Sequence, residues 1–263
     1  MARLRVDHGE LFFECSGKGH PVVLLHGFGL DSRMWEPQWE TFSSAFRVIR
    51  YDLRGFGRSS PVPAERYSHE DDLKALLLSV DAPIAHVVGL SMGGRMALRF
   101  AAAYPAMVRS LVLADSALDG YAWSDDWQRR WKEMCECAKE GRIAKAKRKW
   151  FEHPLFASAR STSSLASHLS EMIGDYSGWH WRNSDTAPAP SPPLAERLGE
   201  IRTPTLAITG SRDLPDFLAI AEKLTAEMPM ARRKIIPGAG HMVNLEAPQL
   251  FHEVMQEFWA GLG

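Results

Sequence analysis

A serine between two glycines follows a predicted strand and precedes a predicted helix. The apolar, valine-rich run from His86 ends in Ser91, which lies between Gly89 and Gly93, and helical spacing begins directly afterwards. This Gly-x-Ser-x-Gly pattern is typical of a turn too sharp for side chains two residues either side of the serine. A hydroxyl exposed there, at a helix N-terminus, can attack a carbonyl carbon. The alternative is that Ser91 only caps the helix.

A serine nucleophile needs a base and a carboxylate that orients the base. Of the ten histidines, His241 follows the last predicted strand, in a glycine-rich loop. Histidine suits the role because its ordinary pKa, near about 6.5, leaves it largely neutral at physiological pH. Asp213 also follows a strand, and it lies between the serine and the histidine in the chain. We predict Asp213 as the orienting acid, with Asp115, which also follows a strand, as its rival.

Two backbone N–H groups are candidates for stabilising the oxyanion that such an attack creates. Met92 directly follows the serine, and Phe28 lies in the loop His26-Gly27-Phe28-Gly29 after an early strand. We therefore predict that the N–H groups of Phe28 and Met92 form the oxyanion hole. His26 is interpreted as a structural histidine that holds its loop.

The elements that must position these residues alternate between strands and helices, which predicts a parallel sheet covered on both faces. Strands are expected at 4–6, 11–15, 21–25, 47–51, 86–90, 110–114, 205–209 and 233–236, and helices at 34–42, 69–79, 92–104, 217–228 and 248–259. Ligands of an open parallel sheet bind outside the carboxyl ends of its strands. All the candidate residues follow strands, so we expect them to meet at that edge.

Residues 118–196 break the alternation, because they contain helical segments without a strand pattern. Six of the nine tryptophans lie in this stretch, which closes with the proline-rich run 187–193. We predict a helical cap at 118–196, inserted into a core formed by 1–117 and 197–263. Four aromatic side chains are predicted to line a substrate pocket: Trp131, Trp179, His180 and Trp181. The alternative is that the tryptophan rings only anchor the cap.

Composition excludes several classes of function. With 263 residues and a net charge of −1, the chain shows no basic footprint for nucleic acid. It has neither a run of about 18 apolar residues nor an N-terminal apolar segment, so we expect no membrane span and no signal peptide. The three cysteines are expected to be reduced thiols of a cytoplasmic protein.

Taken together, the motifs resemble those of the capped esterases and lactonases of the α/β-hydrolase family. The resemblance rests on 26–29, 52–59, 89–94, 210–213 and 240–241, in that order, and covers nearly the whole length. It implies the α/β-hydrolase fold, with an eight-stranded, mostly parallel sheet, helices on both faces, a helical cap insertion, and neither cofactor nor metal. Haloalkane dehalogenases and epoxide hydrolases of this fold are disfavoured, because they need a carboxylate where Ser91 stands.

The resulting hypothesis is a serine hydrolase that cleaves a small carboxylic ester through an acyl-enzyme. An enol-lactonase or a C–C bond hydrolase of aromatic degradation is the alternative within the family. A small-molecule receptor on the same fold is the alternative from another class. The expected partner is a small ester, without nucleic acid or membrane, and the oligomeric state is left open.

Overall fold

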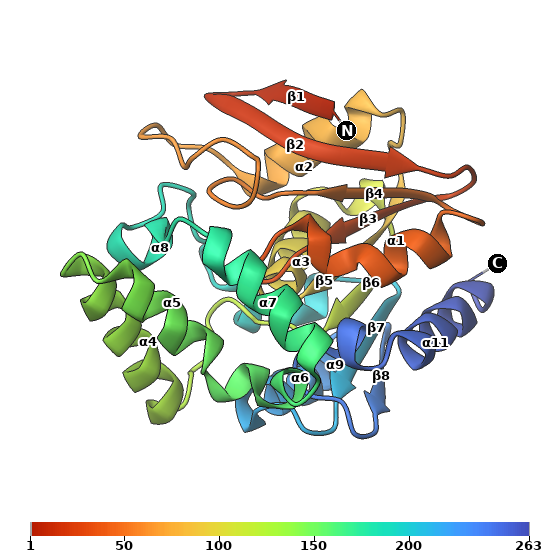
Figure 1. The fold of residues 1–263 in the computed structure, drawn as a ribbon. Coiled ribbons are helices and arrows are strands. Elements are labelled where there is room, and N and C mark those ends of the chain that lie inside the picture. The colour runs from red at the N-terminus through yellow and green to blue at the C-terminus, as the bar shows by residue number, and fades with distance from the viewer. Residues whose placement is uncertain (1, 263) are drawn as a thin grey trace.

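The structure, a computed structural model, describes residues 2–262 and contains one twisted eight-stranded sheet in that range (Figure 1). Its strands are β1 (Ala2–Val6), β2 (Gly9–Ser16), β3 (Pro21–Leu25), β4 (Arg47–Tyr51), β5 (Ala85–Leu90), β6 (Val108–Ala114), β7 (Thr205–Gly210) and β8 (Ala231–Ile236). Their order is β1-β2-β4-β3-β5-β6-β7-β8; β2 pairs antiparallel with both β1 and β4, and all other neighbouring strands pair parallel. The predicted fold class is confirmed.

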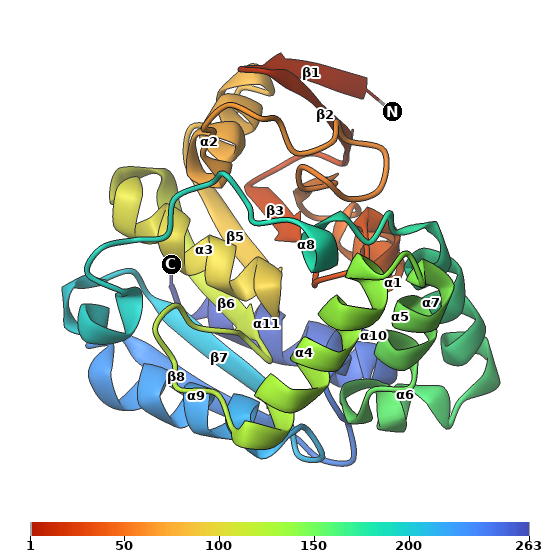
Figure 2. The ribbon, with the colours of Figure 1, turned by 90° about the vertical axis from the view of Figure 1, so that its left-hand side faces the viewer.

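Helices cover both faces of this sheet, as a parallel sheet requires. They are α1 (Glu36–Phe42), α2 (His69–Ser79), α3 (Met92–Ala103), α9 (Pro215–Glu227), α10 (Val243–Glu246) and α11 (Pro248–Ala260). In Figure 2, α2, α3 and α9 lie on one face, and α1 and α11 lie on the other. The sheet is thereby shielded from water on both sides.

The central strands are buried along their whole length, which explains their continuous apolar runs. Every residue of β5 and β7 is buried, as are four of the five residues of β3. Parallel pairing of β3, β5, β6 and β7 brings their carboxyl ends to one edge. The loops that follow these strands therefore open on the same side of the molecule.

Between β6 and β7 the described chain is helical, and we call residues 118–196 the cap segment. It contains α4 (Asp125–Lys139), α5 (Ile143–Phe151), α6 (Ala157–Arg160), α7 (Ser163–Asp175) and α8 (Trp179–Arg182). Trp123 lies outside α4, because it precedes the N-cap residue Ser124. The Trp123 ring nevertheless stacks on that of Trp127, with centroids 4.6 Å apart.

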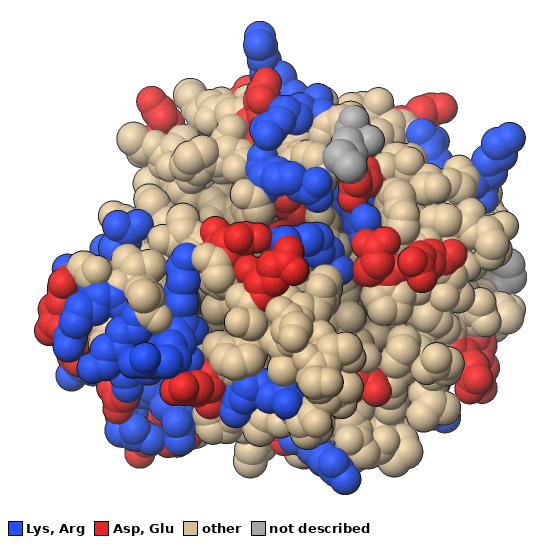
Figure 3. All heavy atoms as spheres, viewed as in Figure 1, with Lys and Arg blue, Asp and Glu red and all other residues tan. Residues whose placement is uncertain are grey.

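Charge on the cap segment is mixed rather than of one sign. Lysine and arginine side chains gather over α4 and α5, with acidic side chains beside them (Figure 3). Lys149 Nζ lies 2.9 Å from Glu133 Oε2, and Arg142 pairs with Glu140. This arrangement matches a solvated helix face.

The thiols of Cys15, Cys135 and Cys137 are all unpaired. Among the described residues, the search for a helix with the length and apolar character needed to cross a bilayer finds none.

Candidate active site

Ser91 occupies a backbone conformation that few residues with side chains adopt. It joins β5 to α3 with φ 57° and ψ −115°, and it is 8% exposed. A Cβ on Gly89 would lie 2.2 Å from the carbonyl oxygen of Gly93, and one on Gly93 would lie 2.1 Å from that of Leu25. Only glycine fits either position. The Ser91 hydroxyl makes no capping hydrogen bond to α3, so the helix-cap alternative is wrong.

Asp213 and His241 are hydrogen-bonded to each other at the edge where Ser91 lies. Asp213 Oδ2 is 2.9 Å from His241 Nδ1, and Asp213 Oδ1 accepts the N–H of Leu214 at 2.7 Å. His241 is 1% exposed, and its Nε2 has no hydrogen-bond partner among residues 2–262. A carboxylate on Nδ1 fixes the tautomer that leaves Nε2 free to accept a proton.

Asp115, the rival acid, lies beside this pair and joins two strand ends. Its N–H donates to the Ile208 carbonyl at 2.8 Å, and its Oδ1 accepts the N–H of Gly210 at 3.0 Å. Burial, followed by the negative charge of Asp213, raises the pKa of the Asp115 carboxyl well above its usual value. The structure therefore places Asp213, rather than Asp115, on the His241 ring.

Asp115, Asp213 and His241 also form a cluster whose candidate ligand atoms all lie within 4.8 Å of one another. The 2.9 Å contact between Asp213 and His241 is a hydrogen bond that occupies His241 Nδ1 and one oxygen of Asp213, which disfavours a metal centre there.

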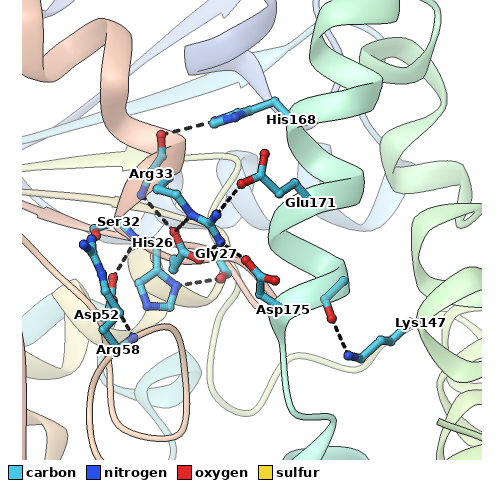
Figure 4. Close-up of polar contacts among 12 residues, drawn as sticks. His26, Gly27, Ser32, Arg33, Asp52, Arg58, Lys147, His168, Glu171 and Asp175 are labelled. Atoms are coloured by element: carbon cyan, nitrogen blue, oxygen red, sulfur yellow. Dashed lines mark hydrogen bonds and ion pairs between the residues drawn. The ribbon is translucent and has the colours of Figure 1, made fainter. Parts of the chain in front are cut away.

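The loop after β3 is held by the histidine that precedes Phe28. His26 is fully buried; its Nε2 accepts the N–H of Leu53 at 3.0 Å, and its Nδ1 lies 2.8 Å from the Gly27 carbonyl oxygen. Burial lowers the pKa of His26, so the ring stays neutral. The predicted structural role of His26 is confirmed. Figure 4 shows its ring between the loop after β3 and the loop after β4, which contains Leu53.

The neighbouring Asp52 fixes the second loop in the same way. Its Oδ1 accepts the N–H of Ser32, and its Oδ2 accepts the N–H of Arg58, each at 2.8 Å (Figure 4). The Asp52 carboxylate therefore ties the loop after β3 to the loop after β4. Both loops border the sheet edge at which Ser91 lies.

A single arginine connects this loop region to the cap segment. Arg33 contacts Asp31 Oδ2 at 2.7 Å, Glu171 Oε1 at 2.8 Å and Asp175 Oδ2 at 2.7 Å. Figure 4 shows its guanidinium pointing at α7, which carries the last two carboxylates. The position of α7 is thus tied electrostatically to the loop that contains Phe28.

A cavity of about 590 Å³ opens beside Ser91, a volume typical of a small-molecule site. The predicted oxyanion residues Phe28 and Met92 line it together with Ser91, and Met92 is the first residue of α3. The N–H of a first helical residue has no carbonyl acceptor within its own helix. The oxyanion role of the two N–H groups stays a prediction.

The four predicted pocket residues have different positions. Trp131 and His180 line the cavity. Within the described chain, the lining contains neither Trp179 nor Trp181. Trp181 is 1% exposed, with its ring 5.1 Å from that of Tyr176, so it packs behind the wall. Trp179, His180 and Trp181 share the single turn of α8, in which successive side chains point in different directions.

Sequence reasoning did not single out several residues of this wall. They are Trp123, Trp127, Trp150, Phe217, Arg95, Arg99 and Asp185. For Arg95, the sequence did offer a signal: a residue four positions after Ser91 lies on the same face of the helix. For the aromatic residues, the tryptophan-rich composition indicated an apolar pocket without saying which rings face it.

The fold and this constellation agree with a family match along most of the chain. The family model described as alpha/beta hydrolase fold matches residues 20–248. The chain belongs to the α/β-hydrolase family. This α/β-hydrolase is 27% identical to 3-oxoadipate enol-lactonase 1 of Acinetobacter baylyi, in a match that covers 90% of this chain and 87% of the relative.

A second sequence relative and a solved structure are also similar to this α/β-hydrolase. It is 29% identical to a 2-hydroxy-6-oxononadienedioate/2-hydroxy-6-oxononatrienedioate hydrolase of Paraburkholderia xenovorans, covering 99% of this chain and 94% of the relative. It also resembles the solved structure of a thermophilic esterase from Thermogutta terrifontis, with a TM-score of 0.80, 25% identity, and coverage of 100% of this chain and 99% of that one. The chain is therefore a hydrolytic enzyme.

Proposed function

We propose that this α/β-hydrolase cleaves a small carboxylic ester through an acyl-enzyme, with Ser91 as nucleophile, His241 as base and Asp213 as orienting acid. The observation that carries the proposal is the 2.9 Å hydrogen bond between Asp213 and His241 at the strand edge that holds Ser91. The unpartnered Nε2 of His241 is the atom that would take the serine proton.

The proposed reaction has two halves that use the same groups. Ser91 Oγ attacks the ester carbonyl while His241 accepts its proton, and the N–H groups of Phe28 and Met92 stabilise the oxyanion. Each such donor contributes roughly 3 kcal/mol to lowering the barrier. His241 then protonates the leaving alcohol, and water repeats the attack on the acyl-enzyme to release the acid and free Ser91.

The names of two relatives support a second candidate function, which uses the same catalytic groups on a different bond. One is named an enol-lactonase and another a hydrolase of a dienedioate, so a lactone or a C–C bond activated by a carbonyl is the alternative substrate class. A panel of simple esters, lactones and vinylogous diketo acids distinguishes the three by relative kcat/KM. The proposed cytoplasmic location rests on the three unpaired thiols.

The proposal is tested by Ser91→Ala with a short p-nitrophenyl ester as substrate. We expect kcat to fall by at least about 10³-fold, while Ser44→Ala, a control at an exposed serine, retains the wild-type rate. Undiminished hydrolysis by Ser91→Ala would overturn the proposal. Stoichiometric labelling of Ser91 without steady-state turnover would instead support the receptor alternative.

A further inference from the structure

Two groups of side chains stand out in the lining of the cavity. One group consists of aromatic rings: Phe28, Trp123, Trp127, Trp131, Trp150 and Phe217. The other is polar and consists of His69, Arg95, Arg99 and Asp185. Both groups share the cavity with Ser91. A substrate that fills this space therefore meets both aromatic rings and charged groups.

Two charged side chains of the polar group, Arg99 and Asp185, already have partners within the protein. The Arg99 guanidinium donates two hydrogen bonds to Asp119, at 2.6 Å and 2.7 Å, and lies 4.0 Å from Glu70. This parallel, two-point pairing is the strongest form of such a contact. Arg99 and Asp119 thus neutralise each other.

Asp185 is also satisfied without a ligand. Its Oδ1 accepts the N–H of Ala187 at 3.0 Å, and its Oδ2 accepts the Tyr67 hydroxyl at 3.2 Å. The same Oδ2 lies 3.8 Å from His69 Nε2 and 3.7 Å from His180 Nε2. The Asp185 carboxylate is consequently held by the protein on several sides.

Arg95 differs from both. Its guanidinium makes no hydrogen bond to any residue in the described range, and its buried Nε lacks a hydrogen-bond partner there. Its ion pair with Asp119 is long, 3.9 Å, and uses the oxygen that already accepts a 2.7 Å hydrogen bond from Arg99. The accessible 36% of the Arg95 side chain borders the cavity, and burial lowers the pKa of the group.

We propose that Arg95 binds a carboxylate of the substrate, so that the ester cleaved at Ser91 is the half-ester or lactone of a diacid whose second carboxylate remains ionised. The aromatic wall would take the apolar alcohol or ring portion of the same molecule. This inference rests on the proposed function, because it uses the ester bond at Ser91 as its reference point. A guanidinium with free donors is the group best suited to two-point recognition of a carboxylate.

The spacing along α3 limits the length of the diacid. Ser91 precedes α3 directly, and Arg95 follows one turn later on the same face, about 6 Å farther along the axis. Side chains in a helix lean toward its N-terminus, which brings the Arg95 head back toward the serine. A separation of two to four methylene groups between the two carbonyl carbons fits this distance, as in succinate, glutarate and adipate.

The kinetic test compares three benzyl esters that differ only in the charge at the end of the acyl chain. Monobenzyl glutarate is anionic, benzyl pentanoate is neutral, and the benzyl ester of 4-(trimethylammonio)butyrate is cationic. We expect the wild-type kcat/KM to be at least tenfold higher for the anionic ester than for the neutral one. In Arg95→Met this preference should fall at least tenfold, and Arg95→Lys should restore part of it.

Lys132→Met is the matched control, because Lys132 is 77% exposed on the outer surface of the cap segment. We expect this control to keep the wild-type preference for the anionic ester. An equal preference in wild type and Arg95→Met would overturn the proposal. A preference for the cationic ester would also overturn it.

A binding measurement separates this proposal from the proposed hydrolysis. In a Ser91→Ala background, 4-phenylbutyrate should quench tryptophan fluorescence with at least tenfold higher affinity than 4-phenylbutanol. Adding Arg95→Met should remove this difference. Loss of turnover for every ester together with retained, Arg95-dependent binding would contradict the proposed function alone. Equal binding of the acid and the alcohol in the Ser91→Ala background would contradict the carboxylate site.

Discussion

At the carboxyl edge of the sheet, side chains are positioned by the main chain, whereas in the cap segment they are positioned by packing among rings. Ser91 depends on a left-handed φ of 57° and on two glycines that face carbonyl oxygens closer than 2.5 Å to any added Cβ. The ring of Trp127, by contrast, is held between Trp123 at 4.6 Å and Phe217 at 5.5 Å.

The contrast indicates how each region responds to change. A main-chain constraint has one solution, so the catalytic edge should lose function abruptly when any part of it is altered. A wall of packed rings can be repacked with other apolar side chains of similar volume at modest cost. We infer that the edge determines how a bond is cleaved and that the cavity wall determines which molecule is accepted.

The largest effect is expected from removing the negative charge of Asp213, which is hydrogen-bonded to His241. Asp213→Asn should lower kcat on the order of 10⁴-fold, because the amide favours the wrong tautomer of His241. Asp115→Asn should cost less than about tenfold, since Asp115 bonds main-chain groups rather than the ring. Steady-state kinetics on one ester measures both. A larger loss in Asp115→Asn would make Asp115 the functional acid.

Two glycine substitutions should affect the free energy of unfolding in opposite directions in the two regions. Gly93→Ala should lower the free energy of unfolding by about 3 kcal/mol, because the new methyl group would meet the Leu25 carbonyl oxygen at 2.1 Å. Gly174→Ala in α7 of the cap segment meets nothing within 4 Å, and it should stabilise the fold by about 0.5 kcal/mol. Urea denaturation measures both values. Equal effects would remove the distinction between the two regions.

Per side chain, acidification should have a smaller effect on stability than Gly93→Ala, and the effect should be shared by the two regions. Burial lowers the pKa of His86 in β5 and of His153 in the cap segment to about 4 in each case. The unfolded chain takes up protons on these rings near pH 6.5 while the folded chain does not. Stability is therefore full above pH 6.5 and falls toward pH 4, by about 2 kcal/mol per histidine at pH 5.

The matched variants for this effect are His86→Asn and His153→Asn. Each should reduce the loss of unfolding free energy between pH 7 and pH 5 by about 2 kcal/mol. We expect equal reductions, because buried residues of the sheet and the cap segment belong to one continuous hydrophobic cluster. If His153→Asn left the main unfolding transition unchanged while His86→Asn altered it, the cap segment would be unfolding separately.

The positions of Ser91, Asp213 and His241 at one sheet edge could be predicted from the sequence, because the constraints on strand ends are local. Apolar runs end where glycines and polar residues begin, and parallel pairing then brings Ser91, Asp213 and His241 to one edge. The strand ends need no knowledge of neighbouring helices. Asp213 and Asp115 both follow strands and both lie between Ser91 and His241 in the chain. The structure separates them, because it places Asp213 on the histidine ring.

The cavity wall could not be predicted in the same way. Trp181 and His180 are adjacent in the sequence, yet only the histidine lines the cavity, because a one-turn helix has no periodicity from which to read a direction. An arginine in a helix, such as Arg95, normally indicates a solvated face. Its functional environment arises from Arg99 and Asp119, whose pairing leaves Arg95 without a hydrogen bond in the described chain.

The proposed mechanism requires that Ser91 become covalently acylated. The direct measurement is the intact mass of the protein after exposure to a p-nitrophenyl alkylphosphonate, which reacts with a serine that has an active base. We predict one adduct per chain, located on the peptide that contains Ser91, and no adduct in Ser91→Ala. An adduct on another residue, or an unmodified wild-type protein that still hydrolyses esters, would contradict the account.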